Sequence, residues 1–465
     1  MVVMKASCIV WLLAASLSAA DLKSSVDKLL GTVPSGGKAA VVVFDLDRQK
    51  LLYSAHGGVP MSPASLVKLT VSACALHQFG STYTMSTTLV AMGGSPRDGV
   101  CPQLGVIAGG DPCLDEHFYD QDPDRAFVEW AQALKARGIT RIAGDIVIDG
   151  SRFSGPIRPD TYPQDPENQQ RWYSAPASAF AWNDNCIEVR VVPTRAGEPC
   201  TVQLRPRSSR VVVRNLTKTV ATRGDSNITV SRDPNANTVT VSGSYSRASD
   251  WFEVAIHSDP DLLTGDHLRS ILVGAGIAVG GKVRLGAVPA DAPVLVATSH
   301  DLLPALTILN VRSQNFYGEM LLRQLGVARV GEGSISAGCT AVDTVLRELV
   351  GPDVSGYTVL DGCGLSYDNV ACADFFARLL WSIHTSPMAA EYVSTLKRED
   401  SGAVKGYVKT GSLAIASNLA GYLDRPRKGG RVCFAILLNR GTARGFAWGS
   451  TLRERLFQAL CRGIE

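Results

Sequence analysis

The sequence predicts an α+β protein in which one domain is split by a long β-rich insertion. Three observations indicate this fold class. Residues 39–77 carry a strand–turn–strand pattern followed by a helical pattern. Short β-rich runs separated by Gly, Pro, Asn and Asp fill residues 83–299, and long helical patterns with further strands return in residues 300–465. Both ends of the chain combine strand patterns with helical patterns. We therefore expect residues 21–82 and 300–465 to form one discontinuous domain around the inserted region.

Length and composition are those of a globular protein with more than one domain. At roughly 150 residues per domain, the chain of 465 residues corresponds to about two to four domains. Hydrophobic residues make up 45% and charged residues 19%, which suits sizeable apolar cores. The formal net charge of +3 is too close to zero to favour nucleic acid as a partner.

The N-terminus has the pattern of a secretory signal peptide. Lys5 precedes an apolar run at residues 9–17, and the small residues Ser18-Ala19-Ala20 follow. A membrane anchor is the alternative, but a helix that crosses a bilayer needs about 20 apolar residues. We therefore expect residues 1–20 to be cleaved and the mature protein to be exported to the periplasm or cell envelope. The sequence leaves open whether the exported protein associates peripherally with a membrane.

Cysteines are numerous enough for disulfides. The chain has 11, and an exported protein can oxidise the ten that follow the signal peptide. The close pairs Cys101/Cys113 and Cys186/Cys200 are the first candidates. Zinc is the alternative use of cysteine, but the sequence contains no Cys-x-x-Cys or His-x-x-x-His spacing. We therefore expect neither a metal nor a cofactor.

The N-terminal elements follow from local patterns. A helix is expected at Ser24–Leu30, followed by a hairpin of strands Ala39–Leu46 and Leu51–Ser54 around a polar turn. A second helix is expected to begin at Ser62-Pro63, since serine caps free N–H groups and proline suits the first turn. Apolar residues at helical spacing continue this helix to about His77.

The remaining elements are expected from the same two periodicities. Four strands stand out in the insertion, at Arg141–Asp149, Ile187–Val192, Arg210–Arg214 and Thr238–Ser242. Three helices follow, at 302–311, 315–325 and 336–349. The chain then continues through strands at 406–409, 418–423 and 432–438 to a last amphipathic helix at about 447–461.

Ser65 and Lys68 are the first candidate catalytic pair. A serine hydroxyl becomes a good nucleophile when a neighbouring base takes its proton. Residues three apart share a face of a helix, so Lys68 is expected beside Ser65, and burial or a nearby cation can lower a lysine's pKa toward neutrality. The first turn of a helix also directs N–H groups at a developing oxyanion. The same spacing occurs at Ser25 and Lys28, where a surface helix is the simpler interpretation, so spacing alone does not identify a nucleophile.

Ser313-Gln314-Asn315 is the only Ser-x-Asn in the sequence. In a catalytic role, Ser313 would relay a proton to the leaving amine, and Asn315 would hold the scissile amide and Lys68. For the tripeptide alone, a helix N-cap before Phe316 is the simpler alternative.

Lys409-Thr410-Gly411 is the only Lys-Thr-Gly, and Ser412 follows it. A lysine just after a strand can bind a substrate carboxylate, with the hydroxyls of Thr410 and Ser412 donating hydrogen bonds. Gly411 would let the substrate backbone approach closely. The N–H groups of Ser412 and Ser65 could together form an oxyanion hole. A turn with a surface lysine is the alternative.

The order and context of the three motifs make them specific as a set. Ser-x-x-Lys, Ser-x-Asn and Lys-Thr-Gly recur in this order in one class of serine hydrolases, and here the first opens an expected helix and the third follows an expected strand. Further segments match one family, namely Pro63–Leu69, Gly109–Pro112, Gly144–Asp149 with Ser151 and Phe153, and Asp361–Ser366. On these residues the chain resembles the class C low-molecular-mass penicillin-binding proteins, the D-Ala-D-Ala carboxypeptidases of serine peptidase family S13.

The resemblance implies a fold and an activity. The fold is a penicillin-binding, serine β-lactamase-like catalytic domain, an antiparallel sheet of five strands flanked by helices, with two smaller domains inserted between Ser65 and Ser313. The activity is acylation of Ser65 by the penultimate D-Ala of a peptidoglycan stem peptide, release of the terminal D-Ala, and hydrolysis of the acyl-enzyme. β-Lactam antibiotics such as penicillin would trap the acyl-enzyme, and members of the family often also cleave peptide cross-links.

Two residues depart from the family pattern. The family's Asp-Gly-Ser-Gly is Asp361-Gly362-Cys363-Gly364 here, and Tyr367 stands where a basic residue is usual. In the family this loop lines the pocket for the far end of the substrate's side chain, so the departures concern which peptide is preferred. A small turn residue is the simplest role for Cys363, with a disulfide as the alternative.

Two other functions remain open from the sequence. A β-lactamase shares the acylation chemistry but deacylates quickly, and the Glu-x-x-Leu-Asn loop of the class A enzymes is absent between Ser313 and Lys409. A non-catalytic envelope protein on the same fold is the second alternative, and the intact motifs argue against it.

Overall fold

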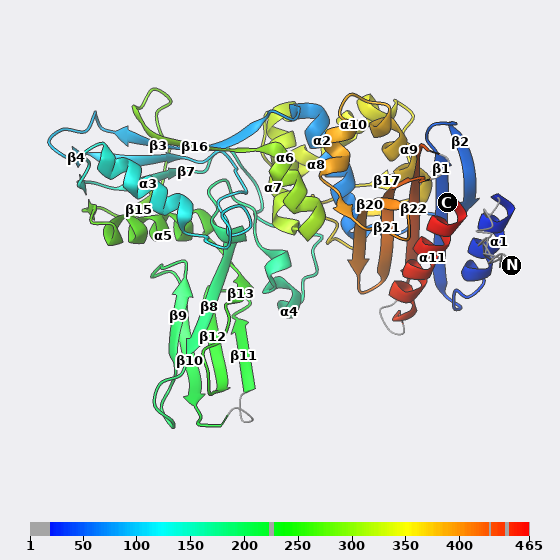
Figure 1. Ribbon diagram of the computed structural model, residues 1–465. Helices are drawn as coiled ribbons and strands as arrows, with labels where there is room; N and C mark the ends of the chain where they lie inside the picture. Colours follow the sequence, from blue (N-terminus) through cyan, green and yellow to red (C-terminus); the bar gives the residue numbers. More distant parts are fainter. Residues whose placement is uncertain (1–18, 223–226, 427–428, 442–445, 465) are drawn as a thin grey trace, which may run out of the picture.

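The computed structural model describes residues 19–222, 227–426, 429–441 and 446–464, and it has the α+β class that the sequence predicts. Figure 1 shows a sheet with helices on both faces at one end of the molecule, a second region of strands and helices at the other end, and a small β module that projects from between them. Residues 1–18, most of the predicted signal peptide, lie outside the described residues.

One six-stranded antiparallel sheet joins the two ends of the chain, with the order β19-β20-β21-β22-β1-β2. Its strands are β1 (Gly37–Asp45), β2 (Lys50–Ala55), β19 (Lys397–Arg398), β20 (Lys405–Leu413), β21 (Ala416–Asp424) and β22 (Arg431–Arg440). The hairpin predicted from the sequence is confirmed as β1 and β2, and β1 also pairs with β22. The resemblance implied five strands, and the sixth is the two-residue β19 at the edge beside β20.

Helices cover both faces of this sheet. α1 (Ala19–Leu30) and α11 (Trp448–Ile464) pack on one face, and α2 (Val67–Phe79) and α9 (Ala373–His384) pack on the other. Successive residues of β1 divide between the two cores, with Val41 and Val43 in the first and Ala40 and Val42 in the second. Because both faces are buried, the central strands are apolar at consecutive positions.

A further layer of helices packs against α2 in the same core. It contains α6 (Leu302–Thr307), α7 (Asn315–Val330), α8 (Ile335–Val350) and α10 (Ala389–Ser394). The short strands β17 (Tyr357–Thr358) and β18 (Val370–Ala371) pair with each other, and Ala371 also forms a bridge with Met61. The chain just before Ser65 is thereby tied to the start of α9.

The first part of the insertion combines strands and helices. Its five-stranded sheet contains β3 (Thr84–Met92), β5 (Gln103–Ile107), β7 (Ile146–Asp149), β15 (Val283–Leu285) and β16 (Val294–Asp301). A three-stranded sheet contains β4 (Val100–Cys101), β6 (Arg141–Ile142) and β14 (Ala278–Val279). α3 (Arg125–Ala136) and α5 (Pro260–Gly274), two helices that the sequence patterns did not suggest, bury Trp130 and Leu268 in the same core.

The second part of the insertion is the projecting module in Figure 1. One sheet contains β8 (Cys186–Val192), β9 (Thr201–Arg205) and β13 (Phe252–Ala255), and the other contains β10 (Val212–Thr219), β11 (Asn227–Arg232) and β12 (Thr238–Tyr245). They share a core of their own that includes Val189 and Val241. Three short turns precede the module, namely α4 (Pro166–Gln169), η2 (Trp172–Ser174) and η3 (Asn183–Asn185).

Several local predictions were wrong in detail. A 3₁₀ turn, η1 (Ala64–Leu66), precedes α2; its capping residue is Pro63, and the Ser62 hydroxyl is buried without a hydrogen-bond partner. The helix expected at 302–311 gives way at Ile308–Arg312 to a π-helical turn. The strand expected at 406–409 continues to Leu413, so the Lys-Thr-Gly motif lies inside β20 rather than after it.

The two candidate disulfides were also wrong. Cys101, Cys113, Cys186 and Cys200 are all free. Cys101 lies in the core of the first inserted sheet, whereas Cys113 lies in the core beside α2. Cys186 and Cys200 are likewise buried in different clusters. Closeness in sequence was therefore misleading, because each segment buries its cysteine in a different core.

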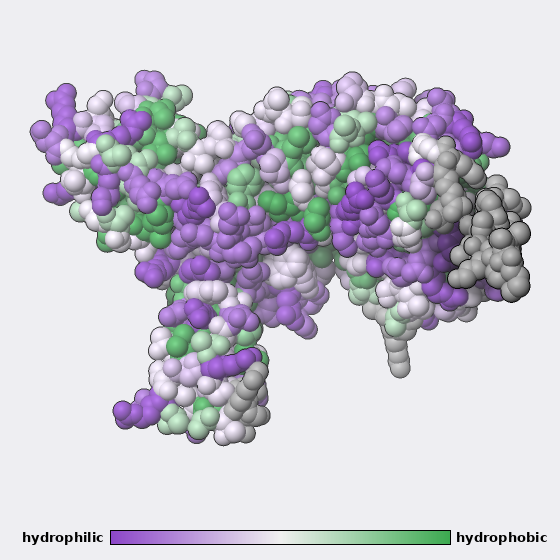
Figure 2. Space-filling model, viewed as in Figure 1, coloured by the Kyte–Doolittle hydropathy of each residue, from purple (hydrophilic) through white to green (hydrophobic). Residues whose placement is uncertain are grey.

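Within the described residues, no helix combines the length and the apolar character that crossing a bilayer requires. On the face shown in Figure 2, hydrophobic residues form separate small patches among hydrophilic ones.

Candidate functional site

Ser65 lies in the η1 turn at the start of α2, where it is partly exposed. The turn has an unusual backbone, since Ala64 adopts a φ of 49°, which costs free energy for a residue with a Cβ. The preceding segment is held from the sheet by two asparagines. Asn439 accepts from the Ser62 N–H at 2.6 Å, and Asn418 donates to the Ser62 carbonyl at 2.9 Å. These bonds hold the segment that carries Ser65 against β21 and β22.

Lys68 is completely buried one turn further along, and its ammonium group contacts three acceptors. Nζ lies 3.0 Å from Ser65 Oγ, 2.7 Å from Asn315 Oδ1 and 2.7 Å from the Cys363 carbonyl oxygen. Burial lowers the pKa of Lys68, while the nearby Cys363, Asp361 and Glu319 act in the opposite direction. A lysine with a lowered pKa, in contact with a serine hydroxyl, can act as a base toward it.

The Ser-x-Asn segment lies between the π-helical turn and α7. Ser313 adopts a left-handed φ of 60°, and Asn315 is the first residue of α7, with Gln314 rather than Asn315 in the capping position. While its oxygen accepts from Lys68, the Asn315 amide nitrogen donates to the Tyr173 carbonyl at 2.8 Å. Tyr173 belongs to η2, so the insertion contributes directly to this site.

Lys409 is buried on β20 and faces the second motif. Its Nζ donates to Ser313 Oγ at 2.8 Å and to the Thr410 carbonyl at 2.8 Å. Burial, and then the positive charges of Lys68 and Lys397, hold the pKa of Lys409 well below its usual value. The structure thus brings Ser65, Lys68 and Asn315 into direct contact, and it joins Ser313 to Lys409.

The rest of the third motif lies beside the Ser65 turn. Thr410 is partly buried and Ser412 is exposed. A Cβ on Gly411 would come 2.5 Å from the Pro63 carbonyl oxygen and 3.1 Å from the Leu66 nitrogen. The glycine is therefore required for the strand to pack against the chain's own η1 turn, which is a different reason from the substrate contact expected from the sequence.

The loop at residues 361–366 binds the Lys68 ammonium group through a backbone carbonyl, a role that the sequence did not predict. The Asp361 carboxylate accepts the N–H groups of Cys363 and Gly364 at 3.0 and 2.5 Å, and that of Ser366 at 2.7 Å. These bonds fix the loop so that the Cys363 carbonyl points at Lys68. An aspartate followed by glycines is a recognisable turn signal, and it could have suggested this ordered loop.

Cys363 and Tyr367, the two departures from the family pattern, lie in different environments. The Cys363 thiol is fully buried, 3.0 Å from the Tyr162 hydroxyl, and burial raises its pKa. Tyr162 also donates to Glu319 at 2.9 Å, and the Gly362 N–H donates to the same carboxylate at 2.7 Å. Tyr367 is 40% exposed. Of the two, only Tyr367 presents its side chain to solvent.

Gly364 supplies a stability test of this loop. It has a φ of 86°, and a Cβ would lie 1.9 Å from the Ala64 carbonyl oxygen. We expect Gly364→Ala to lower the free energy of unfolding by about 1–3 kcal/mol or more, measured by denaturant titration. Gly331→Ala is the matched control, because Gly331 has a φ of 83° and open space around it. Equal losses in the two variants would contradict the close packing of the loop against η1.

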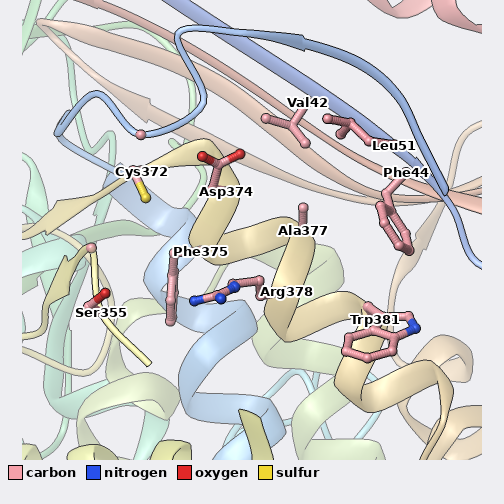
Figure 3. A pocket seen from close by; sticks show the side chains of 12 residues that line it. Val42, Phe44, Leu51, Ser355, Cys372, Asp374, Phe375, Ala377, Arg378 and Trp381 are labelled. Atoms are coloured by element: carbon pink, nitrogen blue, oxygen red, sulfur yellow. The ribbon is translucent and has the colours of Figure 1, made fainter. Parts of the chain in front are cut away.

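A separate cavity of about 460 Å³ lies between α9 and strands β1 and β2. Figure 3 shows Phe44 above Trp381 at one end of the cavity. Arg378 and Phe375 both belong to α9, and the Arg378 side chain extends toward Phe375. None of the eight candidate residues lines this cavity. The hydrogen bonds among the motifs, not this cavity, therefore define the candidate site.

Comparison with known proteins identifies the family. Residues 22–455 match the model of the D-Ala-D-Ala carboxypeptidase 3 (S13) family. The chain is 30% identical over 448 residues to a D-alanyl-D-alanine carboxypeptidase of Actinomadura sp. (strain R39), covering 90% of this chain and 81% of the relative.

Solved structures share the fold. Penicillin binding protein 4 from Haemophilus influenzae has a TM-score of 0.75 at 21% identity, covering 94% of this chain and 99% of that one. A predatory endopeptidase from Bdellovibrio bacteriovorus has a TM-score of 0.51 at 14% identity, covering 92% and 93%. Because the family model matches nearly the whole of this chain, the chain belongs to the D-Ala-D-Ala carboxypeptidase 3 (S13) family of serine peptidases.

Proposed function

We propose that this serine-type D-Ala-D-Ala carboxypeptidase uses Ser65 as its nucleophile and Lys68 as the base that activates it. The observation that carries the assignment is the 3.0 Å contact between Lys68 Nζ and Ser65 Oγ, made by a fully buried lysine. Lys68 accepts the Ser65 proton as Oγ attacks the carbonyl carbon of the penultimate D-Ala. The N–H groups of Ser65 and Ser412 stabilise the oxyanion.

Collapse of the tetrahedral intermediate breaks the peptide C–N bond. The leaving amine of the terminal D-Ala takes a proton relayed through Ser313, which is hydrogen-bonded to Lys409. Asn315 orients Lys68 through its oxygen. Water then attacks the ester on Ser65 while Lys68 accepts its proton, the bond to Oγ breaks, and Lys68 passes that proton to the serine oxygen. The contacts of Lys68 with Ser65 and Asn315, and of Lys409 with Ser313, support these roles.

Lys409 and the hydroxyls of Thr410 and Ser412 bind the C-terminal carboxylate of the substrate. A buried lysine with a depressed pKa is unfavourable as an isolated cation. An arriving carboxylate supplies the missing countercharge and so favours the protonated lysine. This pairing supports a substrate that ends in a free carboxylate, as a peptidoglycan stem peptide does.

β-Lactam antibiotics are proposed inhibitors, because they would acylate the same serine. The H. influenzae protein has been solved in complex with a β-lactam. A β-lactamase remains the rival, and the two differ in deacylation: slow hydrolysis of bound penicillin supports the peptidase, and rapid turnover supports the lactamase. A non-catalytic envelope protein would show no turnover of any substrate.

The proposal also divides the chain and places it in the cell. Residues 1–20 are a signal peptide, residues 21–82 and 300–465 form the catalytic domain, and residues 83–299 form two inserted domains. The six-stranded sheet built from both ends of the chain and the separate cores of the insertion support this division. Action on peptidoglycan requires export to the periplasm or cell envelope, where peripheral membrane association remains to be measured.

Labelling followed by mass spectrometry tests the assignment of Ser65. The mature protein is incubated with fluorescent penicillin, separated on a denaturing gel and digested. The adduct is expected on the peptide that contains Ser65 and not on the peptide that contains Ser25, the residue with the same Ser-x-x-Lys spacing. Absence of label, or label on another serine, would reject the assignment.

A substrate assay separates the two peptidase activities. Release of D-Ala from a pentapeptide measures carboxypeptidase activity, and cutting of a cross-linked dimer measures the endopeptidase activity that we also propose. The ratio of the two rates decides which reaction dominates. A dimer left intact under conditions in which the pentapeptide is cut would reject the endopeptidase part.

Glu319→Gln should shift the pH dependence of catalysis. Burial and the neighbouring Asp361 raise the pKa of Glu319 to about 7, and its negative charge favours protonated Lys68. Removing that charge lowers the pKa of Lys68 further, so the acid limb of kcat/KM moves to lower pH. Glutamine keeps the acceptor oxygen for Tyr162. The exposed Glu454→Gln serves as control, and a shift toward higher pH would contradict the electrostatic role.

A further inference from the structure

A second cluster of ionisable side chains lies beside the Ser313 motif. Asp115 and His117 follow β5 and its loop, and Asp184 lies in η3. One ligand atom from each of the three residues lies within 4.8 Å of the other two. Asp115 is completely buried, and the side chains of His117 and Asp184 are 15% and 13% exposed. The three side chains are therefore largely buried.

Part of this cluster lacks hydrogen-bond partners. His117 Nε2 lies 3.5 Å from Asp184 Oδ2, but His117 Nδ1 and Asp184 Oδ1 are both buried without a partner. Buried polar atoms are normally satisfied, because leaving one unpaired costs about 1–3 kcal/mol. The better satisfied Asp115 accepts from the Tyr317 hydroxyl at 2.7 Å and from the Phe118 N–H at 2.8 Å.

Gln314 connects the cluster to the second motif. Its amide nitrogen lies 3.0 Å from His117 Nε2 and also contacts Asp184 Oδ2. The two ends of an amide are assigned from their hydrogen bonds, so a half-turn of the side chain would present the Gln314 oxygen to the same point. A ligand bound between His117 and Asp184 would therefore contact Gln314, which lies between Ser313 and Asn315 in the second motif.

Carboxyl groups outnumber basic groups at the cluster. Asp115 and Asp184 belong to it, and Glu253 interacts electrostatically with Asp184 and His117. The basic groups with the largest effect on it are His117 itself and the exposed Arg312. Crowded carboxylates of this kind favour a cation among them.

We propose that Asp115, His117 and Asp184 bind a divalent transition-metal ion, with Zn²⁺ as the best match. One imidazole nitrogen and two carboxylate oxygens form a donor set that Zn²⁺ accepts, and the Gln314 oxygen or a water completes four-coordination. Mg²⁺ and Ca²⁺ fit less well, because they prefer oxygen ligands alone. The bound ion would join the loop after β5, η3 and the start of α7, and so hold Gln314 in place.

The sequence did not predict this metal site, because short Cys and His spacings are the local signal for a metal site and the sequence contains none. The proposed ligands form no such spacing, since Asp184 lies far along the chain from Asp115 and His117. Folding within the insertion brings the three side chains together, since the Asn183 N–H donates to the Leu114 carbonyl at 3.0 Å and the Glu116 N–H donates to Asn183 Oδ1 at 3.1 Å. Their convergence is independent of the roles assigned to Ser65 and Lys68.

Metal binding is tested on the mature protein after it has been stripped with a chelator. Equilibrium dialysis against Zn²⁺, followed by elemental analysis, is expected to give one ion per chain. His117→Ala and the nearly isosteric Asp184→Asn should each bind Zn²⁺ more than about 100-fold more weakly, because each removes a direct ligand. His77→Ala is the matched control and should leave binding unchanged, since His77 lies at the surface, 3.7 Å from Glu348.

A second readout separates Zn²⁺ binding at this site from Zn²⁺ binding to cysteine thiols elsewhere in the chain. Zn²⁺ is expected to raise the midpoint of thermal unfolding of the wild type, because a ligand that binds only the folded state stabilises it. The same addition should leave the midpoint of Asp184→Asn unchanged. If the wild type retains no Zn²⁺, or if wild type, His117→Ala and Asp184→Asn retain it equally, the proposal is overturned.

Discussion

Ser65→Ala is expected to take no penicillin label and to lose D-Ala release by a factor of about 10⁴ or more, while folding as the wild type does. The reason is the loss of the hydroxyl that becomes the acyl ester. Ser65 is partly exposed and its side chain contacts Lys68, so removing one oxygen leaves the buried contacts of η1 intact. Lys68 keeps two of its three acceptors, Asn315 and Cys363.

The labelling experiment has a matched control in the chain itself. Ser25 also precedes a lysine by three residues, in a second Ser-x-x-Lys sequence, but it lies on α1, away from the other motifs. Ser25→Ala should label at the wild-type rate, and thermal unfolding should show that both variants are folded. A folded Ser65→Ala protein that labels as fast as wild type would place the nucleophile elsewhere.

Lys68→Ala is expected to lower kcat/KM by about 10²–10⁴, the usual contribution of a positioned proton-transfer group. The acylation rate with penicillin should fall in parallel, because the same proton transfer starts both reactions. Removing the side chain also leaves the carboxylates of Asp361 and Glu319 without their cationic neighbour, so unfolding must be measured alongside activity.

Lys68→Arg distinguishes the role of Lys68 as a proton acceptor from its role as a positive charge. Arginine keeps a positive charge and hydrogen-bond donors but does not deprotonate in proteins, so this variant should be about as inactive as Lys68→Ala. In the wild type, kcat/KM should rise with pH as Lys68 loses its proton. Because burial lowers the pKa of Lys68, this rise should lie below the ordinary lysine value of about 10.4. Activity retained by Lys68→Arg would rule out proton abstraction by this residue.

Local patterns predicted much of the catalytic region correctly. The hairpin at β1 and β2, the helix after Ser65 and the strands β20 to β22 all follow from periodicities of two or 3.6 residues. Boundaries were less accurate where backbone conformation depended on distant contacts. Ser62 failed as a cap because its main-chain groups bond to Asn418 and Asn439, which lie far along the sequence.

The insertion was predicted less well. The helices α3 and α5 were not recognised among the strands, and the cysteine pairs were chosen by closeness in sequence. The contribution of Tyr173 to the site was also missed, because it is made through a backbone carbonyl. Every residue has such a group, so the identity of the side chain carries no signal for it.

The sequence by itself determined which chemical groups are present and in what order. It also determined that Lys68 lies beside Ser65, because a separation of three residues on a helix is a local geometry. Only the tertiary structure decided that Asn315, the Cys363 carbonyl and the Ser65 hydroxyl all contact the same buried ammonium group. It likewise decided that Lys409 meets Ser313. The depressed pKa of Lys68 arises from burial beneath segments that are distant in the chain, and burial is a property of the packed molecule rather than of any short motif.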